Sequence, residues 1–131
     1  MLKPKVFLGT TILMLFVMCI VGCGQPEKPE GTITAGELLR EPIYNTEVKV
    51  YGRVKDLGKI QCLCFFLTSG GDSIQVWYDM MVENDGNERP AVSVKGIQNG
   101  DMVIVSGELK GESGTHYSKD DFWAKSIVIP Q

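Results

Sequence analysis

Residues 48–55 read Val-Lys-Val-Tyr-Gly-Arg-Val-Lys and alternate apolar with polar side chains around a central glycine. This period of two predicts a β-strand that turns one face toward a core. A similar order returns at 103–109, Val-Ile-Val-Ser-Gly-Glu-Leu, with glycine at the same place, within a strand predicted at 102–109. Matching glycines in two long alternating strands are typical of the bends by which a closed barrel turns its corners. The two stretches therefore indicate a small barrel.

Three more strands are predicted, at 62–67, 73–78 and 122–129. The first two are joined by Thr-Ser-Gly-Gly-Asp at 68–72, a run rich in residues that tolerate the backbone of a tight turn. They continue the strand at 48–55 as a meander. The segment 79–99 has a weaker pattern, with a polar loop at 83–90, and we expect it to be an insert before the fourth strand.

A short helix is predicted ahead of the barrel. Thr34 and Glu37 have the spacing of a capping box, in which the side chain of each accepts a hydrogen bond from the other's backbone N–H. Pro42 limits the helix to one or two turns, because the residue before a proline is driven toward extended geometry. Leu38 and Leu39 are expected to cover one end of the core.

These elements together resemble the OB-fold, a five-stranded Greek-key barrel. The resemblance is carried by Val-x-Val-x-Gly at 48–52, by Phe65-x-Leu67 and Ile74-x-Val76 on either side of the Gly70-Gly71 turn, by Gly-Asp-x-Val-x-Val-x-Gly at 100–107, and by Ala124 and Ile127. It covers about residues 34–129 and is similar to small exported OB-fold proteins, including the family described as like tRNA-anticodon-binding domains. The predicted fold class is all-β, a five-stranded OB-fold barrel with a short N-terminal helix.

Alternation divides the strand residues into two faces. The predicted core consists of Val48, Val50, Leu63, Phe65, Leu67, Ile74 and Val76. The remaining side chains, which we call the outer face, are Tyr51, Arg53, Cys62, Cys64, Phe66, Gln75 and Trp77. Three aromatic rings and an arginine on one face suit the stacking of sugars or bases. The alternative is that these rings pack beneath residues 79–99 or a partner chain.

The resemblance implies where a ligand binds, since OB-folds use the second and third strands and the loops joining strands one to two and four to five. The candidate ligand-binding residues are Tyr51, Arg53, Phe66, Gln75, Trp77, His116, Tyr117 and Lys119. No nucleophile pattern accompanies His116, so we expect a binding protein and not an enzyme. The expected ligand is an oligonucleotide, an oligosaccharide or a peptide, and the alternative is an assembly protein that binds a protein partner through the same face.

The N-terminus resembles the signal peptide of an exported lipoprotein. Lys3 and Lys5 precede a 16-residue apolar run from 6 to 21, and Ile-Val-Gly-Cys at 20–23 resembles a lipobox, which implies acylation of Cys23, palmitate included. The alternative is a short, uncleaved membrane anchor. We expect a signal peptide at 1–22, a lipidated Cys23 with a flexible tether at 23–33, and the OB-fold domain at 34–131. The protein is then exported and held on the periplasmic or extracellular face of a membrane.

The charge argues against general nucleic-acid binding. The 131-residue chain has a formal charge of −3, and removal of Lys3 and Lys5 with the signal peptide leaves 11 basic and 16 acidic residues, or −5. Affinity for nucleic acid comes largely from Lys and Arg that neutralise phosphates. Nucleic acid therefore remains a disfavoured partner of this domain.

Cofactor binding is not expected. Cys62 and Cys64 sit two apart on a predicted strand, where a disulfide has poor geometry, so we interpret them as two small apolar residues. A haem or metal carrier is a distant third function. The barrel is similar to the haem chaperone of cytochrome c maturation, but residues 125–131 contain no histidine in the place where that family attaches haem.

Overall fold

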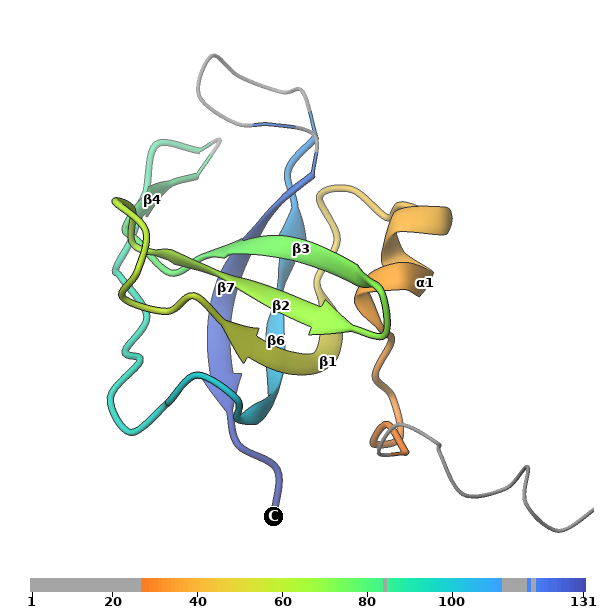
Figure 1. The fold of residues 1–131 in the computed structure, drawn as a ribbon. Helices are drawn as coiled ribbons and strands as arrows, with labels where there is room; N and C mark the ends of the chain where they lie inside the picture. The colour runs from red at the N-terminus through yellow and green to blue at the C-terminus, as the bar shows by residue number, and fades with distance from the viewer. Residues whose placement is uncertain (1–26, 84, 112–117, 119) are drawn as a thin grey trace, which may run out of the picture.

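The computed structural model describes residues 27–83, 85–111, 118 and 120–131. Five strands form a closed barrel in the order β1-β2-β3-β7-β6 (Figure 1). All neighbouring pairs are antiparallel except β3 and β7, which are parallel. This is a five-stranded OB-fold barrel with one short helix, so the predicted fold class is confirmed.

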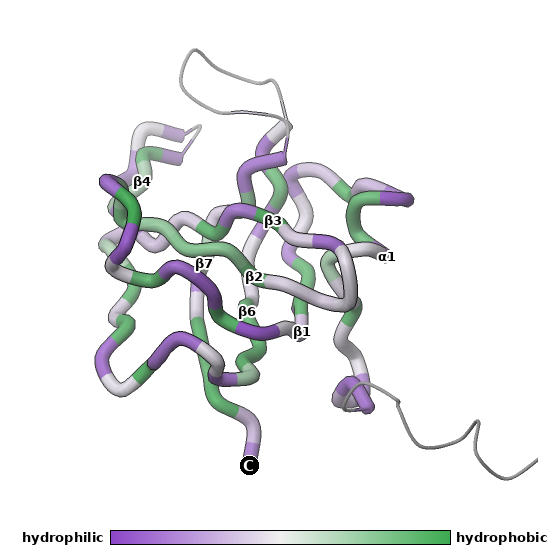
Figure 2. Tube along the Cα trace, in the orientation of Figure 1, coloured by the Kyte–Doolittle hydropathy of each residue, from purple (hydrophilic) through white to green (hydrophobic). Residues whose placement is uncertain are grey.

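The strands follow the predicted positions closely. The barrel strands are β1 Val48–Lys55, β2 Cys64–Ser69, β3 Asp72–Trp77, β6 Met102–Leu109 and β7 Asp121–Val128. Hydrophilic and hydrophobic residues alternate along β1 (Figure 2). The insert contains a small two-stranded sheet, formed by β4 Met81–Val82 and β5 Glu88–Arg89.

The second strand differs from its prediction. It begins at Cys64 and not at Cys62, because residues 60–63 bend before the ladder with β3 starts. Leu63 is consequently 46% exposed, and its assignment to the core was wrong. The other predicted core residues of β2 and β3 are at most 2% exposed.

Two non-strand segments contribute to the core of the barrel. Helix α1, Ala35–Arg40, buries Ala35 and Leu38 completely and contacts β1, β2 and β3. In the insert, Val92, Val94 and Ile97 pack against the same core and are partly buried. These three residues of the insert therefore help to complete the core.

The predicted capping box is present at the start of α1. The Thr34 backbone N–H donates to Glu37 Oε2 at 2.7 Å, and the Glu37 backbone N–H donates to Thr34 Oγ1 at 3.2 Å. Lys28 Nζ donates to both oxygens of Glu37, at 2.6 and 2.7 Å. The hydrogen bond to Lys28 and those to Thr34 hold the pKa of the Glu37 carboxyl below its usual value.

Contacts with the barrel extend to the N-terminal side of Thr34. Ile33 forms a parallel bridge with Val50, in which the Ile33 N–H donates to Lys49 O and the Tyr51 N–H donates to Ile33 O, both at 2.9 Å. Ile33 thereby lies beside the half of β1 that β2 does not pair with.

Within the described residues, no helix has the length and apolar character needed to cross a membrane.

The two matching glycines allow close approach of the strands. A Cβ at Gly52 would lie 2.7 Å from Thr68 O and 2.9 Å from Leu67 Cγ. Gly107 stands at the irregularity in the β6–β7 pairing, where a Cβ would overlap the Trp123 carbonyl. Both strands thus need glycine where the barrel wall turns.

Candidate ligand-binding face

Part of the predicted outer face is accessible to solvent. Arg53 is exposed, and Phe66, Gln75 and Trp77 are partly exposed. Phe66 pairs directly with Gln75 across β2 and β3, and Lys55 pairs with Phe66 across β1 and β2. Directly paired residues of antiparallel strands have Cβ atoms about 4.5–5.5 Å apart, so their side chains form one continuous row.

Tyr51 differs from its prediction, because it is only 8% exposed. It lies outside the core cluster, on the half of β1 that bridges to Ile33, and it is buried there. Tyr51 contributes a wall to a neighbouring pocket and not an open ring for stacking.

A tryptophan pair extends the face onto β7. Trp77 and Trp123 stack with ring centroids 5.5 Å apart and planes 12° apart. The two residues are register partners across the parallel strands β3 and β7. Trp123 was not among the predicted site residues, although its alternation with Phe122 and Ala124 in the last strand is visible in the sequence. It is 7% exposed, so Trp77 is the member of the pair that a ligand can reach.

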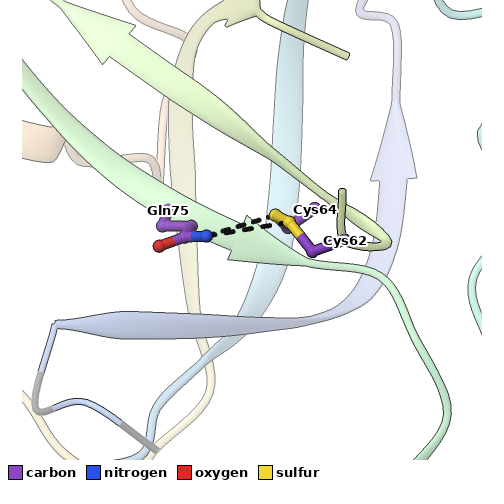
Figure 3. Close-up of a disulfide and its surroundings, with 3 residues drawn as sticks. All are labelled: Cys62, Cys64 and Gln75. Carbon is purple, nitrogen blue, oxygen red and sulfur yellow. Dashed lines mark hydrogen bonds between the residues drawn. A yellow bond between two sulfur atoms is a disulfide. The ribbon is translucent and has the colours of Figure 1, made fainter. Parts of the chain in front are cut away.

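Cys62 and Cys64 form a disulfide beside this pair (Figure 3). Their interpretation as two unbonded small residues was therefore wrong. Because the chain bends before β2, the Cα atoms are 5.1 Å apart, within the range of about 4.4–6.8 Å that disulfides require. Gln75 Nε2 lies 3.1 Å from Cys64 Sγ and 3.8 Å from Cys62 Sγ. The disulfide thus contacts a predicted ligand-binding residue and fixes its amide.

Cys64 is fully buried, although alternation placed it on the outer face. It is the register partner of Trp77, and its sulfur lies under the Gln75 amide. Cys62 is partly exposed. Within the described chain, His, Cys, Asp and Glu form no group of three or more that is arranged to hold a metal ion.

A pocket of about 240 Å³ opens where β1 meets the β2–β3 turn. Its walls combine basic, hydroxyl-bearing and apolar residues: Lys28, Thr34, Tyr51, Arg53, Thr68, Ser69, Gly70 and Met102. Tyr51 and Arg53 were predicted as ligand-binding residues. Thr68 and Ser69 were not, because the sequence there indicated only a tight turn. The candidate residues thus divide into this pocket and the Phe66–Gln75–Trp77 face.

The other predicted residues lie outside the described residues. These are Cys23, His116, Tyr117 and Lys119.

An ion-pair network holds β6 against β7. Glu108 accepts hydrogen bonds from Lys110 at 2.7 Å and from Lys125 at 3.2 Å, and these lysines also pair with Glu83 and Glu47. Partial burial raises the pKa of the Glu108 carboxyl, but its two lysine partners outweigh this effect and leave the pKa below its usual value. The network compensates the charge of the buried Lys110 and links β6 to β7 in the barrel wall.

Comparison with known proteins supports the fold. No family model matches the sequence, and no curated protein matches it at a significant level. The Stn1–ten1 complex of S. pombe aligns with a TM-score of 0.50 and 10% identity, over 78% of this chain and 77% of that chain. The telomere capping protein Ten1 from Saccharomyces pombe aligns at 0.49 and 13%, over 76% and 79%. The hypothetical protein ygiW from E. coli aligns at 0.49 and 16%, over 81% and 98%. At such identities, the likeness to the Stn1–ten1 complex supports the barrel fold alone.

Proposed function

We propose that this chain is an exported, lipid-anchored protein whose OB-fold binds an oligomeric ligand without catalysis. The observation that carries the proposal is the continuous row of Phe66, Gln75 and Trp77 on β2 and β3, with the Trp77 ring held by Trp123. OB-folds bind oligonucleotides and oligosaccharides on this face. A ring whose orientation is fixed loses less freedom when a ligand unit stacks on it.

The Gln75 amide suits recognition of a polar ligand unit. Its nitrogen is directed at the sulfurs of the disulfide, which fixes the orientation of the whole group. The amide oxygen has no hydrogen-bond donor among the described residues, so it is available to accept from a hydroxyl or an amino group. Phe66 beside it supplies an apolar surface. An aromatic ring next to an oriented acceptor recognises one sugar or base per site.

The binding proposal is tested by tryptophan fluorescence, since both tryptophans belong to this face. The protein is titrated separately with single-stranded oligonucleotides and with oligosaccharides, at low and at high salt. We expect a saturable change that Phe66→Ala weakens by about 10-fold or more, because a stacking contact contributes about 1–3 kcal/mol. Tyr44→Ala is the matched control, because Tyr44 is 40% exposed and lies outside the face.

The salt dependence separates the ligand classes. A response that falls steeply with salt identifies a nucleic acid, and one that is insensitive to salt identifies a neutral sugar. Equal affinities of wild type and Phe66→Ala would contradict the assigned face.

The lipid anchor is tested separately. Metabolic labelling with palmitate is expected to modify the wild type and the Cys19→Ser control, and to be absent from Cys23→Ser. Labelling that persists in Cys23→Ser would refute acylation at this cysteine.

A second candidate is an assembly protein that binds a protein partner. It is favoured by three apolar side chains near the start of β2 and in the insert, namely Leu63, Met80 and Val82, which are 46%, 50% and 51% exposed. The Tyr78 N–H donates to Leu63 O at 2.9 Å, so the two stretches of chain lie side by side. Absence of any response to sugars and oligonucleotides would favour this candidate.

A further inference from the structure

The pocket beside the β2–β3 turn has a charge that contrasts with the rest of the chain. Lys28 and Arg53 line it, and no acidic residue is among its lining residues, although the formal charge of the chain is −3. Lys28 is paired with Glu37, so its charge is largely compensated. The excess positive charge of the pocket therefore comes from Arg53.

Arg53 is held in place with donors to spare. One guanidinium nitrogen, Nη1, donates to Gly100 O at 2.8 Å, which fixes the group at the pocket wall. A guanidinium has five N–H donors in a rigid fork, and this fork matches the oxygens of a phosphate in a bidentate arrangement. The arginine is thus oriented before any anion binds.

Two hydroxyl-bearing residues that line the pocket, Thr68 and Ser69, are also fixed. Ser69 Oγ donates to Tyr51 O at 2.9 Å, and it accepts from the Ala35 N–H at 3.3 Å. Thr68 Oγ1 donates to Arg53 O at 3.3 Å. These bonds join the end of β2 to β1 and α1, so the pocket is formed by three elements and does not depend on a single loop. Its volume of about 240 Å³ suits a small group better than a drug-sized ligand.

The pocket also lies near the proposed lipid. Cys23 is five residues before Lys28, and an extended chain spans at most about 3.6 Å per residue, so the two Cα atoms lie within about 18 Å. If Cys23 is acylated, the pocket is then held close to the headgroup layer. For this location the inference rests on the proposed function.

We infer that this pocket binds a phosphate group, with Arg53 as its main ligand and Lys28 in a lesser role. The phosphate belongs either to the headgroup of an anionic phospholipid or to a soluble phosphate ester. Both sources present the same oxygens to the guanidinium. The inference adds a phosphate site separate from the Phe66–Gln75–Trp77 face and does not depend on stacking at Phe66 and Trp77.

The test uses the full acylated protein in uncharged detergent micelles, titrated with inorganic phosphate by calorimetry. We expect Arg53→Gln to weaken phosphate binding about 10-fold or more, since hydrogen bonds to charged groups contribute about 1.5–3 kcal/mol. Lys28→Gln should have a smaller effect, because Lys28 is paired with Glu37. Arg40→Gln is the matched control, since Arg40 is exposed, carries the same charge and lies outside this pocket.

Arg53→Lys, which keeps the charge but not the fork, is expected to fall between wild type and Arg53→Gln. Thermal unfolding of each variant checks that it is folded. Equal phosphate affinities for wild type, Arg53→Gln and Arg40→Gln, or no binding by any of them, would overturn the inference.

The source of the phosphate is decided by repeating the titration in nanodiscs. If the headgroup is the occupant, wild type binds inorganic phosphate more weakly in phosphatidylglycerol discs than in phosphatidylcholine discs. This difference between the two discs is then absent from Arg53→Gln. Equal binding in both discs identifies a soluble ester. The micelle experiment does not require the fluorescence response of the outer face, so a failure of the proposed function and a failure of this subsite are distinguishable.

Discussion

Trp77 on β3 and Trp123 on β7 stack across the parallel pair of strands in the barrel, with their ring centroids 5.5 Å apart. The contact therefore joins two strands that are distant in sequence and forms one edge of the candidate binding face. The Trp77 indole nitrogen is buried and has no hydrogen-bond partner among the described residues. The pair is thus held by ring contact and not by hydrogen bonding at Trp77.

The first prediction concerns this pair. Trp77→Ala should lower the free energy of unfolding by about 2 kcal/mol, because it removes a partly buried ring and its stacking contact with Trp123. Trp77→Phe should cost less than about 1 kcal/mol, since a ring remains and a buried unpaired N–H is removed. Denaturant unfolding measures both. Equal losses of unfolding free energy in the two variants would show that an aromatic ring at position 77 does not stabilise the fold.

The second prediction concerns the bend in β1. Gly52→Ala should destabilise the fold by about 1–3 kcal/mol, because its Cβ would stand 2.7 Å from the backbone oxygen of Thr68. Gly71→Ala is the control, as no atom lies within 4 Å of its added Cβ. We expect that control to change stability by less than about 0.5 kcal/mol in the same unfolding experiment. Similar values for the two variants would contradict a steric role for Gly52.

The third prediction concerns acid. Hydrogen bonds from Lys28 and Thr34 lower the pKa of Glu37 in the folded state, so the folded protein binds its proton less readily than the unfolded chain does. This contribution is present above the usual pKa of 4.5 and is lost as pH falls through the lower folded value. Unfolding followed between pH 6 and about pH 2 should show a shallower acid loss in Glu37→Gln. An identical pH profile for wild type and Glu37→Gln would rule out this linkage.

The fourth prediction concerns the cysteines. In protein isolated without reductant, an alkylating reagent should leave Cys62 and Cys64 unmodified, and reduction should expose both. Peptide mass spectrometry reads both states. A disulfide of this kind persists in the oxidising environment to which export would deliver the chain. Alkylation of both residues before reduction would show that the bond is absent.

Local patterns predicted the barrel well where the alternation was dense. Residues 48–55 became a strand with those bounds, because each of its valines has a polar neighbour that fixes the register, and the return of its Val-x-Val-x-Gly order located the strand at 102–109. The capping box also followed from residue spacing alone. These features depend on residues close in sequence.

Other features depended on contacts that no local pattern contains. The run from Cys62 to Leu67 has little alternation, so nothing in it showed that the strand starts at Cys64 and leaves Leu63 exposed. Tyr51 is buried on the part of β1 that bridges to Ile33, which lies 18 residues earlier in the chain. Trp123 joins the candidate site because β7 runs parallel to β3, a pairing that arises only when the barrel closes.

The assignment of the binding face is tested most directly by two-dimensional ¹H–¹⁵N NMR of the protein with added oligosaccharide or oligonucleotide. The chain has two tryptophans, Trp77 and Trp123, so the spectrum holds two indole signals, and Trp77→Phe assigns them. We predict saturable shifts of the Trp77 indole, the Gln75 side-chain amide and the Phe66 backbone amide with one of the two ligands. Shifts confined to residues away from β2 and β3, with all three of these signals unmoved at saturation, would contradict the account.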